Sequence, residues 1–360
     1  MFNFKWLLET PKYTVFRVNK LMDFDIEKLK NHLEEVYCLI VEQWPFIINI
    51  EKTRNEVLVD PLCASAVLRG AHVYAPGVLG LPSNCVLNER IDIYGAMDGK
   101  CRRGLKVKYD GDKKYVGTGY LKMLRYNIFD KGIQPSGIAV QTLLPASMLP
   151  VINETIFPRG HVLLQNLPSI IAGWVVNAQP YEYILDMCAA PGNKTTHLAE
   201  MSCNKRLIKL FKKLTKYNNL VIHKVLHNIK KENMMDPPYS SNMFNKILLD
   251  APCSGLGQRP QTNNKITPKM LQSYKFVQRK LFDAVIKILK VNGKLVYSTC
   301  TVTVDENEGM VAWALEKYPC LKLIPAEPLY GGPGLPDVGL SDAITFFYKY
   351  QCFSRTILIN

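Results

Sequence analysis

The 360-residue sequence has no apolar run long enough to cross a bilayer, and its opening, MFNFKWLLETPK, places Lys5 and Glu9 where a signal peptide needs an apolar core. Ten cysteines are scattered without CxxC pairs, and no group of Cys and His has the spacing of zinc ligands. These absences argue against a membrane protein, a secreted disulfide scaffold and a structural zinc domain. We therefore expect a soluble cytoplasmic protein with reduced thiols and no metal.

Acidic residues are also scarce relative to basic ones. The chain has 45 Lys and Arg against 31 Asp and Glu, a formal net charge of +14, while 48% hydrophobic residues are typical of a globular protein. An excess of positive charge favours a polyanionic partner, either a nucleic acid or an acidic membrane surface. Composition does not distinguish between the two.

Three regions of the chain differ in their residue patterns. Residues 1–55 form a small α/β segment, in which 24–37 has the apolar spacing of a helix. Residues 56–145 contain short apolar runs separated by Gly, Pro, Asn and Asp turns, a pattern that predicts a compact β-barrel. In residues 146–360 strand and helix patterns alternate, which predicts a doubly wound, Rossmann-like α/β domain.

The elements of this third region can be placed individually. Residues 183–186, 246–250 and 294–298 have the continuous apolar character of buried strands. Residues 271–289 have the periodicity of a helix, and residues 161–176 form a long amphipathic segment. The chain therefore alternates between strands and helices, as a parallel sheet requires.

A turn of small residues follows the first of these strands, in the sequence MCAAPGNKTTH that starts at Met187. Small residues let the backbone approach a ligand closely, and the N–H groups at a helix start can hold carboxylate or ribose oxygens. A ribose site usually adds an acid about 20 residues later, but residues 201–231 contain no Asp or Glu and nine Lys and Arg. This basic run is either a solvated helix face or a phosphate-binding strip.

Two cysteines follow the other two strands, Cys253 after Asp250 and Cys300 after Ser298. The carboxyl ends of strands in an open α/β sheet border the ligand crevice, so both thiols are expected there. A single free cysteine more often packs as a small hydrophobic residue. Their shared position and their pairing favour nucleophiles instead.

Four separated motifs, MCAAPGNKTTH, LLDAPCSGLGQRP, VYSTCTVTVDENE and FRVN, resemble those of the Sun-domain family of RNA (cytosine-5)-methyltransferases. The stretch AVLRGAHVYAPGVLG at Ala66 to Gly80 further resembles the PUA module, a small RNA-binding barrel, inserted in the family's sixth member. The resemblance implies an S-adenosylmethionine-dependent enzyme that forms 5-methylcytosine. It also implies an RNA substrate, such as the acceptor end of a transfer RNA with a 3′ CCA tail, and no obligate protein partner.

The matching motifs carry roles for individual residues. Cys300 would be the nucleophile, Cys253 would assist product release, and Asp250 and Lys194 would hold the target cytosine and the cofactor in register. A thiolate is needed because carbon 5 of cytosine becomes nucleophilic enough to accept a methyl group only after addition at carbon 6. The loop from Ser254 to Pro260, with Gln258 and Arg259, would lie against RNA. The residues implied to bind the cofactor are Cys188, Ala189, Ala190, Pro191, Gly192, Asn193, Lys194 and Asp250.

Departures from the family pattern leave other interpretations open. The second strand and its acid are missing after Ser202, and His227 stands where a later acid is expected. The chain could thus be a catalytically impaired relic that only binds RNA. The motif Asp236-Pro237-Pro238-Tyr239 is found in enzymes that methylate exocyclic amines, but it precedes a strand here and more often forms a turn. A dehydrogenase is poorly supported, because GxGxxG is absent.

Aromatic and basic residues of the barrel region are candidates for RNA contact, because single-stranded ends are recognised by stacking and by phosphate contacts. The alternative to RNA contact is that the aromatic residues pack within the barrel and the charged residues are solvated. The candidates are His72, Tyr74, Lys100, Arg102, Arg103, Tyr109 and Tyr115.

Overall fold

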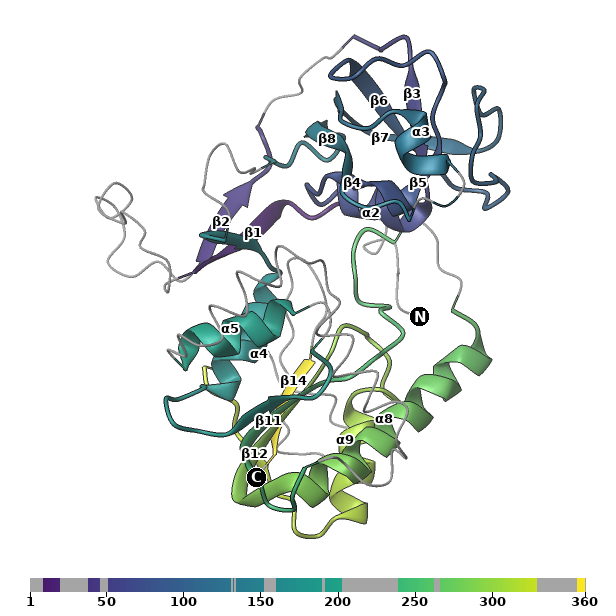
Figure 1. The fold of residues 1–360 in the computed structure, drawn as a ribbon. Coiled ribbons are helices and arrows are strands. Elements are labelled where there is room, and N and C mark those ends of the chain that lie inside the picture. Colours follow the sequence, from purple (N-terminus) through teal and green to yellow (C-terminus); the bar gives the residue numbers. More distant parts are fainter. Residues whose placement is uncertain are drawn as a thin grey trace, which may run out of the picture. The chain divides into compact units, whose positions relative to one another are not determined.

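The computed structural model describes residues 9–19, 38–45, 51–130, 132, 134–151, 160–189, 192–202, 239–261, 266–328 and 355–359. The chain divides into two compact units: Met1–Val15, Ile40–Pro158 and Arg259–Lys265 form the first, and Phe16–Leu39, Arg159–Gln258 and Ile266–Asn360 form the second (Figure 1). No helix among the described residues is long and apolar enough to cross a membrane. The helix predicted at 24–37, the basic run from residue 203 onward, His227 and residues 236–238 lie outside the described residues.

The first unit is built on a six-stranded sheet with the order β4-β8-β7-β6-β3-β5. Neighbouring strands are antiparallel except β3 and β6, which run parallel. The strands are β3 (Glu56–Val59), β4 (Val73–Tyr74), β5 (Val78–Gly80), β6 (Arg90–Ala96), β7 (Lys113–Leu121) and β8 (Ile138–Pro145). The short apolar runs of this region are thus strands, and their buried Val and Ile side chains form a core of their own.

Three short helical segments complete the first unit: α2 (Pro61–Val67), the 3₁₀ turn η2 (Ala75–Gly77) and α3 (Arg125–Phe129). The start of helix α2 follows from its sequence, because the Asp60 side chain accepts a hydrogen bond from the Cys63 N–H and Pro61 stands at the first helical position. The turn η2 joins the two edge strands, β4 and β5.

The second unit contains a five-stranded sheet with the order β10-β11-β12-β14-β13. Its strands are β10 (Ile184–Asp186), β11 (Phe244–Asp250), β12 (Leu289–Thr299), β13 (Leu323–Ile324) and β14 (Arg355–Ile359). Strands β10, β11 and β12 are parallel, while β14 is antiparallel to both of its neighbours. The three strands predicted from the sequence are therefore confirmed as adjacent parallel strands.

Helices cover both faces of this sheet (Figure 1). Helices α8 (Pro268–Ile288) and α9 (Glu308–Lys317) pack on the face that Leu249 and Tyr297 share. Helices α4 (Leu167–Val176) and α5 (Asn193–Met201) pack on the opposite face, against Leu248 and Val296. Successive strand side chains point to opposite faces, so the continuous apolar runs arise because both faces are buried. The Rossmann-like arrangement is thus confirmed.

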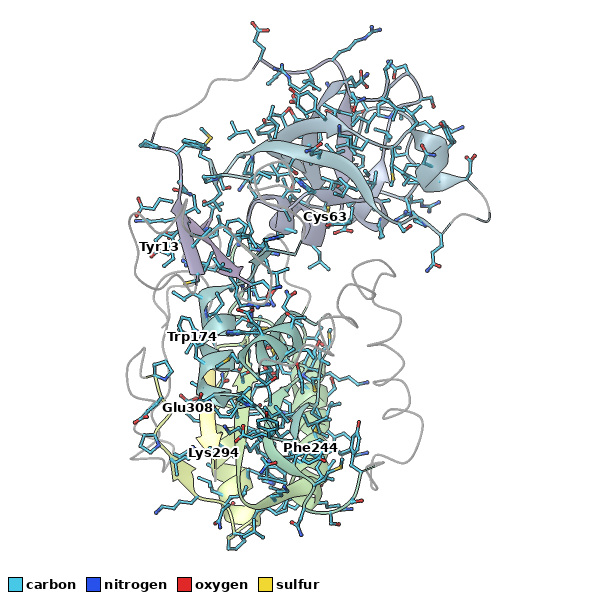
Figure 2. All side chains as sticks on the ribbon, turned by 60° about the vertical axis from the view of Figure 1, so that its left-hand side comes forward. Tyr13, Cys63, Trp174, Phe244, Lys294 and Glu308 are labelled. Atoms are coloured by element: carbon cyan, nitrogen blue, oxygen red, sulfur yellow. The ribbon has the colours of Figure 1, made fainter. Side chains whose placement is uncertain are left out.

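The prediction of one amphipathic segment at residues 161–176 was wrong in its first part. Strand β9 (Val162–Leu164) pairs antiparallel with Phe16–Val18 of β1 (Tyr13–Val18), and helix α4 begins only at Leu167. Helix α4 is buried on most of its circumference, so it has no broad polar face. Trp174 on α4, labelled in Figure 2, lies edge-on to His197 of α5, with 6.5 Å between ring centroids. Strand β2 (Cys38–Glu42) pairs with β1 on its other side.

Candidate active site

The two cysteines that follow β11 and β12 meet in the structure. Asp250 is the register partner of Ser298, so the two strands end side by side. The Sγ atoms of Cys253 and Cys300 lie 3.2 Å apart, and the backbone N–H of Cys300 donates to Cys253 Sγ at 3.3 Å. The convergence of the two thiols expected from their strand-end positions is therefore present.

The loop after Cys253 folds back over Cys300. Gly255 has a φ of +69°, a left-handed conformation that glycine adopts without steric cost, and its carbonyl accepts from the Gln258 N–H at 3.1 Å. The Gly257 N–H donates to the Cys300 carbonyl at 2.9 Å, and the Gln258 side-chain amide, Nε2, donates to Cys300 Sγ at 3.2 Å. Among the described residues, the two side chains that contact Cys300 Sγ, those of Cys253 and Gln258, thus come from the same loop.

The surroundings of the two thiols shift their pKa values in opposite directions. The hydrogen bond from Cys253 lowers the pKa of Cys300, the Gln258 amide and the Lys194 charge act in the same direction, and burial and Asp250 oppose them. The hydrogen bond to Cys300 and burial raise the pKa of Cys253 well above its ordinary value. The proton of the pair therefore resides preferentially on Cys253, which leaves Cys300 as the more thiolate-like group.

Asp250 and Lys194 form a second polar pair beside the thiols. Lys194 Nζ donates to Asp250 Oδ2 at 2.6 Å, and the Ser298 hydroxyl donates to Oδ1 at 2.6 Å. Burial lowers the pKa of Lys194, but the charges of Asp250 and Asp186 outweigh it, so that the pKa is raised. Lys194 therefore stays charged and fixes the orientation of the Asp250 carboxylate.

The small-residue turn leads into α5 as predicted. Gly192, at the N-cap of this helix, has a φ of +112°, which a residue with a Cβ rarely adopts. The Thr195 hydroxyl in the first turn donates to Asp186 Oδ2 at 2.7 Å and lies 3.3 Å from the Ala189 carbonyl. Asn193 is the first residue of the helix, while Ala190 and Pro191 lie outside the described residues.

Asp186, at the end of β10, was not singled out from the sequence. Its Oδ1 is buried and has no hydrogen-bond partner among the described residues. Burial raises the pKa of Asp186 to about 6, although the Thr195 hydrogen bond acts against it. An unpaired buried carboxylate oxygen is costly, and a cationic or hydrogen-donating ligand group would satisfy it.

A cavity of about 400 Å³ is lined by the two thiols together with Asp250 and Lys194. Five of its lining residues were predicted as site residues: Cys188, Lys194, Asp250, Cys253 and Cys300. Its other lining residues, which were not predicted, include Asn166 and Ser169 from the start of α4, and Thr299. Gln258, expected against RNA, also lines this cavity and has an exposed side chain.

A buried carboxylate supports both cysteine loops and was also missed. Glu306, only 1% exposed, accepts from the Ser254 N–H at 2.9 Å and from the Ser254 hydroxyl at 2.6 Å. The hydroxyls of Ser254 and Thr301, the residues that follow Cys253 and Cys300, lie 2.7 Å apart. Glu306 belongs to the VDENE sequence, and this polar motif was the only feature of the sequence that could have indicated its role.

Arg17 of the FRVN motif has a related supporting role for α5. Its buried guanidinium donates to Gln165 at 2.8 Å and to the Thr196 hydroxyl at 2.8 Å, and it forms an ion pair with Glu200. Thr196 and Glu200 both belong to α5. Arg17 therefore ties the helix of the cofactor loop to strand β1.

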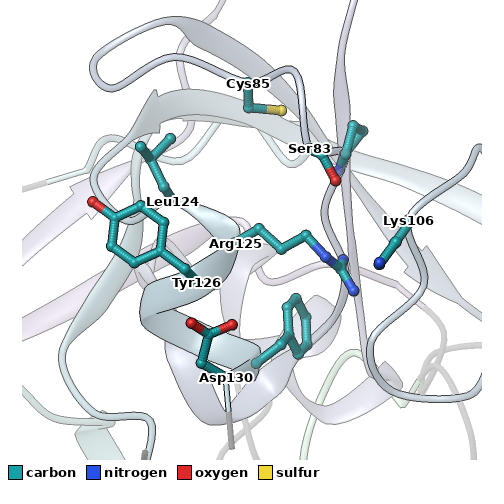
Figure 3. Close-up of a pocket in the computed structure, with 9 residues that line it drawn as sticks. Ser83, Cys85, Lys106, Leu124, Arg125, Tyr126 and Asp130 are labelled. Carbon is teal, nitrogen blue, oxygen red and sulfur yellow. The ribbon is translucent and has the colours of Figure 1, made fainter.

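The first unit holds a larger cavity, of about 560 Å³, shown in Figure 3. Its Arg125 donates to the carbonyls of Leu81 and Leu105, each at 2.8 Å. Its cysteine, Cys85, has a pKa raised to about 12, chiefly by burial, which disfavours the thiolate form. Of these two cavities, the smaller one brings two cysteine thiols together.

The residues of the barrel region that were predicted to contact RNA differ in solvent exposure and in hydrogen bonding. Tyr74 and Tyr115 are 53% and 37% exposed, and Lys100 and Arg102 are exposed as well. Three others already have partners or partial burial. Tyr109 donates to Asp98, Arg103 donates to the Pro76 carbonyl at 2.5 Å, and His72 is half-buried.

The parallel sheet has helices on both faces, a glycine turn after its first strand and two thiols at the ends of the next strands. This is the arrangement of a Rossmann-like methyltransferase domain. A family model described as 16S rRNA methyltransferase RsmB/F matches residues 174–332. The tRNA (cytosine(72)-C(5))-methyltransferase of Pyrococcus horikoshii is 34% identical over 335 residues, 91% of this chain and 80% of that protein. The chain belongs to the Sun-domain family of RNA cytosine-5 methyltransferases.

A further relative and a solved structure agree with this assignment. The human tRNA (cytosine(72)-C(5))-methyltransferase NSUN6 is 41% identical over 312 residues, which are 81% of this chain. The match spans 66% of the human protein's length, just short of two thirds. The crystal structure of NSun6 from Pyrococcus horikoshii with SFG superposes with a TM-score of 0.65 at 26% identity, and covers 99% of this chain and 92% of that one.

Proposed function

We propose that this protein transfers a methyl group from S-adenosylmethionine to carbon 5 of a cytosine in RNA, through a covalent bond between Cys300 Sγ and carbon 6. The observation that carries the proposal is the pair of thiols 3.2 Å apart, in one cavity with Asp250 and Lys194. The lowered pKa of Cys300 supports its assignment as the nucleophile.

We assign a separate role in this reaction to each of the residues Cys300, Asp250 and Cys253. Cys300 Sγ adds to carbon 6, and the displaced π electrons make carbon 5 nucleophilic. S-adenosylmethionine, when bound, supplies the electrophilic methyl group. Asp250 accepts a hydrogen bond from the exocyclic amine of cytosine, a donor that uracil lacks. Cys253 assists the last stage, in which the carbon 5 proton passes to water, its electron pair re-forms the double bond between carbons 5 and 6, and the Cys300 Sγ–carbon 6 bond breaks to return the thiolate.

The cofactor loop fits a ligand of this kind. Asp186 Oδ1 offers a buried acceptor to a cationic amino group, and the N-terminus of α5 at Gly192 and Asn193 offers backbone N–H groups to a carboxylate. Lys194 and Cys188 of this loop line the cavity that holds the two thiols. We assign Cys188, Ala189, Ala190, Pro191 and Asp250 to the cofactor site as well, Ala190 and Pro191 on the motif alone.

The proposed substrate is a transfer RNA with a 3′ CCA end, and the proposed location is the cytoplasm. The net charge of +14 favours a polyanion, and the human and archaeal relatives carry names that specify cytosine 72 of tRNA. We further propose the domain division 1–55, 56–145 and 146–360, with the middle region a PUA-like RNA-binding barrel. Exposed Tyr74 and Tyr115 on its sheet support stacking with single-stranded bases.

The alternative, an RNA-binding relic without turnover, rested on acids missing from a segment that lies outside the described residues. The geometry of the described residues favours an enzyme. RNA binding alone requires neither two neighbouring thiols whose pKa values are shifted in opposite directions nor an aspartate held by Lys194 and Ser298.

The test is methyl transfer to transcribed tRNA with and without its CCA end, followed by nucleoside mass spectrometry for 5-methylcytidine. Wild-type protein should form the product and Cys300→Ser should not, although both bind RNA. Folded wild-type protein that binds tRNA and S-adenosylmethionine but forms no 5-methylcytidine would instead establish the relic.

A further inference from the structure

The thiolate of Cys300 lacks the partner that cysteine nucleophiles commonly use. An adjacent histidine often accepts the thiol proton in such enzymes, yet no histidine is among the described residues that line the cavity. Lys194, a second possible source of stabilisation, is already bonded to Asp250 at 2.6 Å. Stabilisation of the negative sulfur must therefore come mainly from atoms that contact Sγ directly.

The described side chains that contact Cys300 Sγ are Cys253 and Gln258, each at 3.2 Å. Cys253 carries a proton of its own and has a separate proposed role in product release. The Gln258 amide has no titratable proton, so it remains a donor at every pH at which the protein is folded. A hydrogen bond to an ionised acceptor is roughly twice as strong as one between neutral groups.

The position of Gln258 follows from the loop rather than from its own packing. The left-handed Gly255 closes a turn through the Gln258 N–H, and the Gly257 N–H is anchored to the Cys300 carbonyl at 2.9 Å. The Gln258 side chain is exposed, so water would satisfy its amide if the loop did not hold it against sulfur. This backbone geometry keeps the donor in place before any substrate binds.

We infer that Gln258 is a further catalytic residue, whose side-chain amide stabilises the Cys300 thiolate before addition and again when the thiolate leaves carbon 6. This inference rests on the proposed function for the nature of the reaction. The hydrogen bond itself is a property of the free protein. It can therefore be measured in the absence of RNA and cofactor.

The experiment is the pH dependence of alkylation of Cys300 by iodoacetamide, followed by mass spectrometry of the peptide that contains it. Gln258→Glu keeps the shape of the side chain but replaces the donor with an acceptor, and Gln258→Ala removes it. Both should raise the midpoint pH, Glu more than Ala, and alkylation at neutral pH should slow about tenfold for each pH unit by which the midpoint rises. Gln272→Glu and Gln272→Ala, at an exposed position of α8, make the same chemical changes away from the cavity and should leave the midpoint unchanged.

In the part of the chain that the structure describes, the groups that titrate or carry charge beside Cys300 are Cys253, Asp250 and Lys194. Because the two thiols titrate as a coupled pair, the measurement is repeated in a Cys253→Ser background, where the effect of Gln258→Glu should persist. Wild-type midpoints in both Gln258 variants, with circular dichroism showing an intact fold, overturn the inference. An absence of methyl transfer by wild-type protein overturns the proposed function alone, because alkylation needs neither RNA nor S-adenosylmethionine.

Discussion

The candidate site has two ends, which differ in how completely their polar groups are hydrogen-bonded. At the cysteine end, formed by Cys253, Gln258, Cys300 and Glu306, every residue bonds either to another of the four or to Ser254 beside them. At the cofactor end, formed by Asp186, Gly192 and Thr195, Asp186 keeps one buried oxygen without a partner in the described structure. The cysteine end is thus preorganised for a covalent step, whereas the cofactor end is completed by its ligand.

The largest effect is expected from removal of the nucleophile at the cysteine end. Cys300→Ala should reduce methyl transfer to background, since loss of a covalent nucleophile costs on the order of 10⁶-fold in rate where it has been measured. Affinity for S-adenosylmethionine, measured by calorimetric titration, should change little. If Cys300→Ala retained turnover, the cysteine end would have no covalent role.

Next in size is the ion pair that supports the cofactor end. Glu200→Ala leaves the Arg17 guanidinium buried without its counter-charge, and breaking a buried pair costs about 3 to 5 kcal/mol. Urea denaturation should show this loss. Lys317→Ala, which breaks the half-exposed Lys317–Asp283 pair, serves as the control and should cost about 0 to 1 kcal/mol. Equal small losses in both variants would argue against an anchoring role for Arg17.

A smaller effect is expected at Asp250, between the two ends. Asp250→Ala removes the proposed acceptor for the cytosine amine and releases Lys194 and Ser298. The rate of methyl transfer should fall on the order of 10² to 10³-fold, as when one oriented hydrogen-bonding group is lost. RNA affinity, measured by filter binding, should stay within a few-fold of wild type. Equal losses in rate and in binding would contradict the assigned role.

The smallest effect concerns pH and isolates the cofactor end. The Asp186 carboxyl, whose pKa is about 6, must be ionised to pair with a cationic amino group, so affinity for S-adenosylmethionine should fall as pH drops below 6, by up to about tenfold per pH unit. Between pH 6 and about 7.7, where the amino group of the ligand begins to lose its proton, both charges exist and affinity should be flat. Asp186→Asn should weaken binding and abolish the pH dependence. Identical profiles for both proteins would show that Asp186 does not contact the ligand.

The sequence predicted the two cysteines of the cysteine end, but not the side-chain contacts that hold their loops in place. Strands β10, β11 and β12 have long apolar runs, and adjacent parallel strands bring their ends together, so the meeting of Cys253 and Cys300 follows from local patterns. The contacts of Glu306 with Ser254 and of Gln258 with Cys300 join residues 52 and 42 positions apart and depend on loop conformation.

Two further misses have similar causes. The Arg17–Glu200 pair spans 183 positions, and nothing in the local sequence around either residue indicates its partner. Strand β9 has only three residues, too few to show a period of two, so the helical pattern that follows it dominated the interpretation of residues 161–176.

The most direct test of the covalent mechanism is to trap the adduct. Cys253→Ala, incubated with tRNA and S-adenosylmethionine, should accumulate a protein–RNA complex stable to denaturing electrophoresis, because addition and methyl transfer proceed while release is slowed. Peptide mapping should place the RNA on Cys300, and the double variant with Cys300→Ala should form no complex. An adduct on another residue, or undiminished turnover by Cys253→Ala with no adduct, would contradict the division of roles between the two thiols.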